Sequence, residues 1–510
     1  MRDRYDAVVV GAGLGGLSAG AFLAKAGKSV LVVERLDGPG GYLHAFQRGD
    51  YHFDPAVHAI AASGQGMIVD TWLRALGVRD RVQFVPLPAF YTLFLGDHRL
   101  TAPYGVEGFK RAHTEEFPSA AAEISAFVDV CCAIKKEWDQ VRPGLGLTEL
   151  AAKGGGLPTV LRYRGSTLDA VLREFVSDDG ARAALGATWI YLGAPPSRVS
   201  FLSFAGMLVT TLESGESYPV GGFQSLPNAL AVALEENGGE LLLQREVTQI
   251  VVRQGQVQGV RLADGAVVEA PVVVSNGDLT RTLEQLVGPE HLPAAYLSRI
   301  RQMRPSLSAF ILYGATRCDV ARWKTAPQVY VWSNGDYDRI LSRVPEGVFD
   351  GFSLHFSALA EPGLAPPGEH IFVSIVLVPY DIGRSWREEK DRFKEALLAR
   401  IDQRFPGILD GLMFAEASTP LSLERWTLNR GGAVCGWENS PHQTQHRRPS
   451  NTPPLGGLYL VGDWSHPGSG TIHSIGSGFQ AAMHVLHCPG PEALFAAVGF
   501  TPPTDPTVVS

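Results

Sequence analysis

The feature that most limits the possible folds of this chain is a glycine-rich turn close to its amino terminus. The apolar run 7–10 leads directly into Gly11, Ala12, Gly13, Leu14, Gly15 and Gly16. Because the run has no polar alternation, it predicts a strand covered on both faces. In a G-x-G-x-x-G turn the first glycine makes the bend, the second lets the backbone approach a pyrophosphate, and the third lets the next helix pack on the strand. The spacing predicts a dinucleotide site, with a purely structural unit as the alternative.

The residues that follow complete a strand–helix–strand unit. A helix is expected over about 14–26, with free N–H groups at its amino end for phosphates and Gly27 at its end. The apolar run 29–33 predicts a second strand. Glu34 stands at the tip of that strand, where a carboxylate reaches both ribose hydroxyls of an adenosine.

A second glycine turn indicates which dinucleotide the site takes. The chain continues from Arg35 through Gly40 and Gly41 to Tyr42. NAD has no evident use for this turn, whereas a larger cofactor that lies across the sheet does. FAD is therefore the favoured cofactor.

The length and composition of the chain limit its number of domains, its partners and its cellular compartment. A chain of 510 residues exceeds what one core usually serves, so at least two domains are expected. The 44 Lys and Arg stand against 52 Asp and Glu without a long basic run, so nucleic acid is not an expected partner. The five cysteines form neither an even framework nor a C-x-x-C pair, and no leader precedes the first strand. These features predict a cytoplasmic protein and no metal site.

Membrane contact is predicted to be peripheral at most. No stretch approaches 18 uncharged apolar residues, so no bilayer span is expected. The most apolar surface candidate is 199–212, where Phe201, Phe204, Leu208 and Leu212 recur at helical spacing. We interpret this segment as a core helix or a wall of an apolar pocket, with docking on a membrane as the alternative.

Segments in the middle of the chain are predicted to serve the cofactor or the substrate. The aromatic stretch 51–58, which ends at His58, is interpreted as an approach to the cofactor, and the mainly helical 71–212 as a substrate-covering insertion. Val247 is placed where main-chain groups can grip adenine. The strands expected to complete the first sheet are 240–244, 247–253, 257–262 and 272–276, and those expected to form a binding-site wall or a plain structural sheet are 307–313, 329–332 and 371–377.

A second motif lies near the carboxyl terminus. The run 457–461 predicts a buried strand, which a glycine- and proline-rich loop connects to a helix that begins near 472. Asp463, at the tip of the strand, can accept hydrogen bonds from ribityl hydroxyls, and the helix amino end can stabilise negative charge on a reduced flavin. This motif strengthens FAD over NAD. The residues predicted to contact the flavin end are Gly462, Asp463, Gly470, Thr471 and Ile472.

Together these motifs resemble the phytoene desaturase, carotenoid isomerase and retinol saturase family. The resemblance rests on 11–16 with Glu34, on 40–41, on 218–222 and on 458–470, and it spans nearly the whole chain. The stretch 466–468 is similar to the ending of bacterial phytoene desaturases. The pair 462–463 with 467–470 is instead similar to the ending of carotenoid isomerases, so the subfamily stays open.

The resemblance implies a composite α/β fold. A Rossmann-like FAD-binding domain with a parallel sheet is expected from 1–75, 216–285 and 430–490, and a mixed α+β substrate domain with an apolar tunnel from 76–215 and 286–429, followed by a tail, 491–510. The implied partner is a long apolar isoprenoid or polyene, and quinone or oxygen is the candidate electron acceptor. The implied reactions are desaturation of C–C bonds or flavin-dependent cis–trans isomerisation, with saturation of a polyene such as a retinoid as the alternative.

Three histidines are the acid or base candidates. His58, His466 and His473 flank the expected flavin, although a structural role is the alternative for each, because the flavin alone can handle a carbon acid in an apolar tunnel. A flavin amine oxidase would share the scaffold, but it would need an aromatic cage or an acidic anchor that the sequence does not locate. A non-catalytic isoprenoid or cofactor carrier is a further alternative. It would need the same glycines but would catalyse no reaction.

Overall fold

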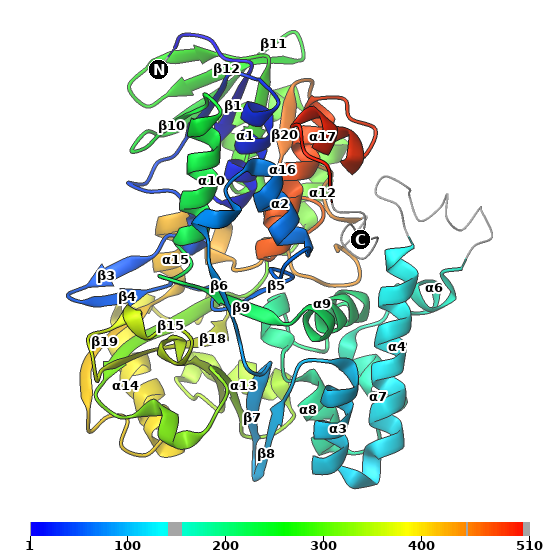
Figure 1. Cartoon of the computed structure of the whole chain (residues 1–510), viewed down its shortest axis with the longest axis vertical. Coiled ribbons are helices and arrows are strands. Elements are labelled where there is room, and N and C mark those ends of the chain that lie inside the picture. Colours follow the sequence, from blue (N-terminus) through cyan, green and yellow to red (C-terminus); the bar gives the residue numbers. More distant parts are fainter. Residues whose placement is uncertain (1, 141–155, 445–446, 503–510) are drawn as a thin grey trace.

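Two large β-sheets and a group of helices make up the computed structural model, which describes residues 2–140, 156–444 and 447–502. A parallel sheet lies at the top of Figure 1, a seven-stranded sheet at the lower left and a group of helices at the lower right. The mixed α/β architecture with a parallel sheet confirms the predicted fold class.

The parallel sheet has the strand order β10-β2-β1-β14-β20. β1 is hydrogen-bonded to β2 on one side and to β14 on the other. The strand order therefore reverses beside β1, and ligands of open α/β sheets bind at the carboxyl edge of such a reversal. The strands are β10 (Glu240–Leu242), β2 (Val30–Val33), β1 (Ala7–Val10), β14 (Val272–Ser275) and β20 (Leu458–Leu460), drawn from three separate stretches of the chain.

Both faces of this sheet are covered. Val9 and Val32 belong to a core shared with α1 (Leu14–Lys25), α10 (Ser225–Glu236) and α16 (Thr471–Val485). Val8 and Leu31 point to the opposite face and join a second core with Ile250. Burial on both sides explains why the first strand is an unbroken apolar run.

The prediction that 247–253 and 257–262 extend the parallel sheet is wrong. They form β11 (Val247–Arg253) and β12 (Gln256–Leu262), which pair antiparallel in a separate sheet with β13 (Val267–Glu269). The two-residue connection 254–255, with φ of 50° and 72°, explains the difference. Such a turn joins antiparallel neighbours, whereas parallel strands need a long crossover.

The seven-stranded sheet separates a helix-covered face from a cavity face. Phe310 and Leu312 of β15 pack with α14 (Trp386–Arg404) in one core, whereas Ala309 and Ile311 line a cavity on the other face. The runs predicted as a binding-site wall thus supply part of such a wall. The strand order is β19 (Leu412–Ser418), β15 (Ser308–Thr316), β18 (His370–Val378), β17 (Gly351–His355), β16 (Gln328–Trp332), β7 (Tyr91–Leu95) and β8 (His98–Ala102).

The apolar segment 199–212 is a core helix. Ser200 caps α9 (Phe201–Ser214) by accepting from the Ser203 N–H at 3.4 Å. The four apolar side chains singled out above are all buried, so they cannot dock on a membrane surface. None of the helices in the described part of the chain combines the length and apolar composition needed to span a bilayer.

The remaining elements cover the cavity or join the larger layers. The expected tail begins with α17 (Pro491–Ala497), which packs on α16 through Phe495 and Phe479, whose ring centroids are 5.1 Å apart; 503–510 lie outside the described residues. The other helices include α2 (Ile68–Leu76), α3 (Val106–Glu116), α4 (Ala121–Asp139), α6 (Pro158–Tyr163), α7 (Leu168–Phe175), α8 (Asp179–Gly186), α12 (Ala294–Gln302), α13 (Tyr337–Arg343) and α15 (Pro420–Thr427). The short strands are β3 (Phe46–Arg48), β4 (Tyr51–Phe53), β5 (Ile60–Ala61), β6 (Phe84–Pro86) and β9 (Glu216–Pro219).

Candidate active site

A cavity of about 1040 Å³ runs from the carboxyl edge of the parallel sheet to the seven-stranded sheet. It brings together most of the residues that the two glycine motifs singled out. Ala12 and Gly16 are the exceptions, because they are buried behind its wall. The predicted residues that line it are Gly11, Gly13, Leu14, Gly15, Glu34, Arg35, Gly40, Gly41, Tyr42, His58, Val247, Gly462, Asp463, His466, Gly470, Thr471, Ile472 and His473.

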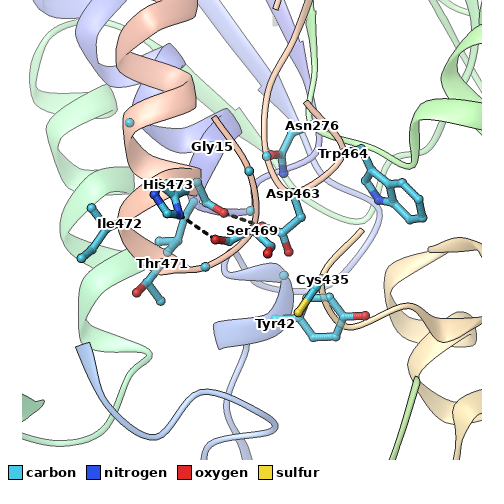
Figure 2. A pocket seen from close by; sticks show the side chains of 18 of the residues that line it. Gly15, Tyr42, Asn276, Cys435, Asp463, Trp464, Ser469, Thr471, Ile472 and His473 are labelled. Carbon is cyan, nitrogen blue, oxygen red and sulfur yellow. Dashed lines mark hydrogen bonds between the residues drawn. The ribbon is translucent and has the colours of Figure 1, made fainter. Parts of the chain in front are cut away.

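The glycine turn has the geometry that its spacing requires. Gly11 has φ +93°, which allows the bend after β1. A Cβ atom at Gly16 would lie 2.1 Å from the Gly11 carbonyl oxygen, so only glycine lets α1 pack this closely. At Gly13 a Cβ atom would lie 2.5 Å from Nδ2 of Asn276, which follows β14 and points into the cavity (Figure 2). Asn276 was not predicted, although a polar residue after an apolar strand was a usable signal.

Glu34 is oriented by two backbone groups. Its Oε2 accepts from the Ala12 N–H and its Oε1 from the Leu36 N–H, each at 2.8 Å. These contacts fix the carboxylate at the cavity wall and leave each oxygen a further lone pair for a ribose hydroxyl. Arg35 instead donates to the carbonyl oxygens of Arg425 and Trp426 at 3.0 and 2.7 Å, so it holds the carboxyl end of α15 against this part of the cavity.

Asp463 lies at the amino end of α16 (Figure 2). Its Oδ1 accepts from the Ser474 Oγ at 2.7 Å. Burial raises the pKa of Asp463, while the Ser474 hydroxyl and the charge of Arg448 act in the opposite direction. The sheet and the helix together orient this carboxyl group at the cavity wall.

A buried arginine behind Asp463 joins two loops. Arg448 donates to the carbonyl oxygens of Cys435, Trp437 and Asp463 at 2.8, 3.2 and 2.6 Å, and to Oδ1 of Asn439 at 3.0 Å. Burial lowers the pKa of Arg448 to about 10. No local pattern marks this residue in the sequence, because its role depends on two loops that only the fold brings together.

Tyr42 and Cys435 form a further side of the cavity (Figure 2). The Tyr42 hydroxyl donates to the Ala433 carbonyl oxygen at 2.8 Å. Burial raises the pKa of the Cys435 thiol to about 12, so the group stays protonated at neutral pH. A protonated thiol is a poor nucleophile, which favours a cofactor held without a covalent bond.

Two of the candidate histidines belong to the α16 side of the cavity. Nδ1 of His466 lies 3.4 Å from Oε1 of Gln480 on α16. His473, in the first turn of α16, has its Nδ1 2.8 Å from the Ser469 carbonyl oxygen, a contact drawn in Figure 2. Burial lowers the pKa of His473. Both imidazoles are therefore held by local contacts at the cavity wall.

His58 belongs to a different group of side chains, beside the seven-stranded sheet. Its ring stacks on that of His355 with centroids 3.5 Å apart, and its Nε2 lies 3.1 Å from the Tyr191 hydroxyl. Tyr191 donates to Oε1 of Gln328, whose Nε2 donates to Oε2 of Glu216 at 2.7 Å. Burial lowers the pKa of His58 to about 4 and raises that of Glu216 to about 7.

This polar group was not predicted beyond His58. Glu216 belongs to β9, Gln328 to β16, and Tyr191 to the short 3₁₀ helix Trp189–Leu192. No local sequence pattern marks an acidic group suited to a cationic substrate, whereas Glu216 lines the cavity in the structure.

The residues present fit FAD. α1 and α16 begin at the same cavity and are preceded by Gly13 and Gly470, so no side chain caps their first N–H groups. Uncapped helix amino ends stabilise anions. One such end suits a pyrophosphate, and the other suits negative charge on a reduced isoalloxazine. Glu34 and Asp463 add acceptors for hydroxyl groups at the two ends of this cradle.

Comparison with known proteins supports a flavin cofactor. The model of a family described as flavin containing amine oxidoreductase matches residues 14–486. The chain is 29% identical to phytoene desaturase (neurosporene-forming) of Rhodobacter capsulatus, with 96% of each chain covered. It is 25% identical to prolycopene isomerase 1, chloroplastic, of an Oncidium hybrid cultivar, with 95% of this chain and 84% of that protein covered.

Solved structures show the same fold. Wild-type putrescine oxidase bound to putrescine has a TM-score of 0.66 at 16% identity, with 95% of this chain and 99% of that chain covered. The predicted resemblance to phytoene desaturases and carotenoid isomerases is confirmed by the sequence relatives. Since the family model covers nearly the whole chain, the protein belongs to the flavin-containing amine oxidoreductase family and is an FAD-dependent oxidoreductase.

Proposed function

We propose that the enzyme acts on a long apolar polyene of the carotenoid type, by desaturating its C–C bonds or by isomerising a double bond. The observation that carries this proposal is the composition of the cavity beyond the FAD cradle. There the wall consists largely of apolar side chains, which stabilise a hydrocarbon by about 25 cal/mol for each Å² removed from water. The side chains are Leu202, Met207, Ile311, Ile375, Leu377, Phe479 and Met483.

Each part of the site has a role in this reaction. Bound FAD supplies the redox chemistry, by accepting or returning a hydride. Glu34 and the amino end of α1 hold the adenosine and the phosphates, and Asp463 holds the ribityl chain. The amino end of α16 stabilises negative charge on the reduced ring. The apolar wall orients the polyene and excludes water.

The histidines differ in what they can do. With a pKa of about 4, His58 is neutral at neutral pH and can accept a proton but cannot donate one as an imidazolium. His466, which lies on the α16 side of the cavity, is the second candidate acid or base. Saturation of a polyene, the reverse hydride transfer, would use the same groups.

Oxidation of an amine is a second candidate function. It is favoured by the fold shared with putrescine oxidase and by the Glu216 carboxyl group, which could pair with an ammonium. Burial acts against this pairing, because it raises the pKa of Glu216 to about 7 and so favours the neutral form. The apolar wall also favours the polyene.

Expression in a host that accumulates a colourless polyene tests the proposal. Desaturation shifts the absorption of the extracted pigments to longer wavelength, saturation shifts it to shorter wavelength, and isomerisation changes the spectrum without a change in mass. An Asp463→Ala variant, expected to lose flavin, is the control. Unchanged pigments, together with flavin bleaching on addition of a primary amine, would contradict the proposal.

We also expect quinone or oxygen to reoxidise the flavin, and the enzyme to work in the cytoplasm with peripheral contact at the inner face of the membrane. An apolar substrate partitions into the bilayer, which supports this location. Reoxidation rates with each acceptor and fractionation of the expressing cells test the two expectations.

A further inference from the structure

Glu216 lines the cavity, and its two carboxyl oxygens differ in their protein contacts. The residue is only 7% exposed and lines the cavity beside Ala61 and Thr211. Its Oε2 accepts from Nε2 of Gln328 at 2.7 Å and from the Tyr104 hydroxyl at 3.4 Å. Among the residues that the structure describes, no donor is hydrogen-bonded to Oε1. One oxygen is therefore held by the protein and the other is left for a ligand.

The groups behind Glu216 hold it in place. Gln328 is itself oriented by the Tyr191 hydroxyl, which donates to its Oε1 and lies 3.1 Å from Nε2 of His58. A carboxamide does not readily pass a proton along a chain of hydrogen bonds, so this array orients groups rather than conducts protons. Tyr191 and His58 also line the cavity, which gives it one polar corner.

We propose that Glu216, positioned by Gln328 and Tyr104, binds an oxygen-bearing end group, a hydroxyl or a carbonyl, on the isoprenoid substrate. This inference rests on the proposed polyene function and narrows its substrate class. A buried polar atom without a partner costs about 1–3 kcal/mol, so a pure hydrocarbon end would leave Oε1 with that penalty. A hydroxyl or carbonyl removes it. The neutral carboxyl group can donate to either oxygen, and the carboxylate can accept from a hydroxyl.

Three ligands of the same chain length test the subsite. Geranylgeraniol, the hydrocarbon in which a methyl group replaces its CH₂OH, and geranylgeranylamine are titrated into the FAD-loaded protein without oxygen. Binding is followed by the change in the flavin absorption spectrum. The alcohol is expected to bind about tenfold more tightly than the hydrocarbon, as one buried hydrogen bond implies.

Three variants assign the preference to one carboxyl group. Glu216→Leu removes the carboxyl group at similar size and is expected to abolish the preference for the alcohol. Glu216→Gln keeps an acceptor for Gln328 and a second polar atom on the same side chain. This variant is expected to retain most of the preference for the alcohol. Glu235→Leu makes the same change at an exposed position of α10 outside the cavity lining and is expected to leave the preference for the alcohol unchanged. Flavin content checks that each variant is folded.

The outcomes separate the subsite from the function on which it rests. Equal binding of alcohol and hydrocarbon to the unmodified enzyme, or a preference that survives in Glu216→Leu, overturns the subsite and leaves the polyene function standing. Failure of all three ligands to bind overturns the polyene function and the subsite with it. Tightest binding of the amine would instead make Glu216 an ammonium anchor, which also overturns the subsite.

Discussion

Replacing Glu216 by glutamine should stabilise the enzyme about three times as much at pH 8 as at pH 5. Burial raises the pKa of this carboxyl group from 4.5 to about 7. Because the folded-state pKa is the higher one, Glu216 binds its proton more tightly in the folded chain than in the unfolded chain. Its contribution to stability is therefore largest below pH 4.5 and is lost as the pH rises through 7. Glutamine can replace the neutral form and cannot ionise.

The size of the effect follows from the two pKa values. The difference between about 7 and 4.5 corresponds to about 3 kcal/mol at pH 8 and about 1 kcal/mol at pH 5. An unfolding entropy of about 2.1 cal/mol/K per residue then gives, for 510 residues, a rise in Tm of about 3 °C at pH 8 and about 1 °C at pH 5. The Gln328 N–H keeps its acceptor in the variant, so no loss of a hydrogen bond offsets the gain.

Thermal unfolding of the FAD-saturated proteins at both pH values measures this difference. Glu235→Gln, at an exposed position of α10, is the matched control and should change Tm by less than about 1 °C at either pH. If Glu216→Gln gains the same stability at pH 5 as at pH 8, or gains none at pH 8, the carboxyl group does not titrate as its burial requires. The reasoning would then be refuted.

Three other predictions concern the cofactor. Glu34→Ala removes the carboxylate that accepts from two backbone N–H groups and that we expect to bind the ribose, so the affinity for FAD should fall by about 10- to 100-fold. Titrating FAD into the apo-protein measures this change. An unchanged affinity would contradict the role of Glu34 in ribose binding. Asp463→Ala should yield protein depleted of flavin, whereas His466→Ala should keep its flavin and lose turnover by about 10²–10⁴-fold if the imidazole transfers a proton. Near-normal turnover of that variant would reduce His466 to a structural role. Acid precipitation should release the yellow colour into the supernatant, because the Cys435 thiol is held protonated, and colour in the pellet would show a covalent bond.

The elements nearest the glycine turn follow from the sequence alone. The helix predicted over 14–26 is α1, Leu14–Lys25, and the apolar runs before and after it are β1 and β2. The glycine spacing and the unbroken apolar runs are local signals, and each of them specifies the secondary structure of its own segment. The prediction was wrong at β11 and β12, where a short strand can join either of two sheets and only the length of its connection decides.

The sequence by itself determined which glycines and acceptors stand at the carboxyl ends of the parallel strands, where we propose that FAD binds, because the neighbours of these residues specify the strand ends. Only the tertiary structure decided the polar corner of the substrate cavity. Glu216, Gln328 and Tyr191 lie on elements far apart in the chain, and none of them is marked by a local pattern. The pKa of Glu216 and the hydrogen bonds of its carboxyl group depend on which groups surround it. Burial and hydrogen bonding are properties of those distant neighbours, which no local stretch of sequence encodes.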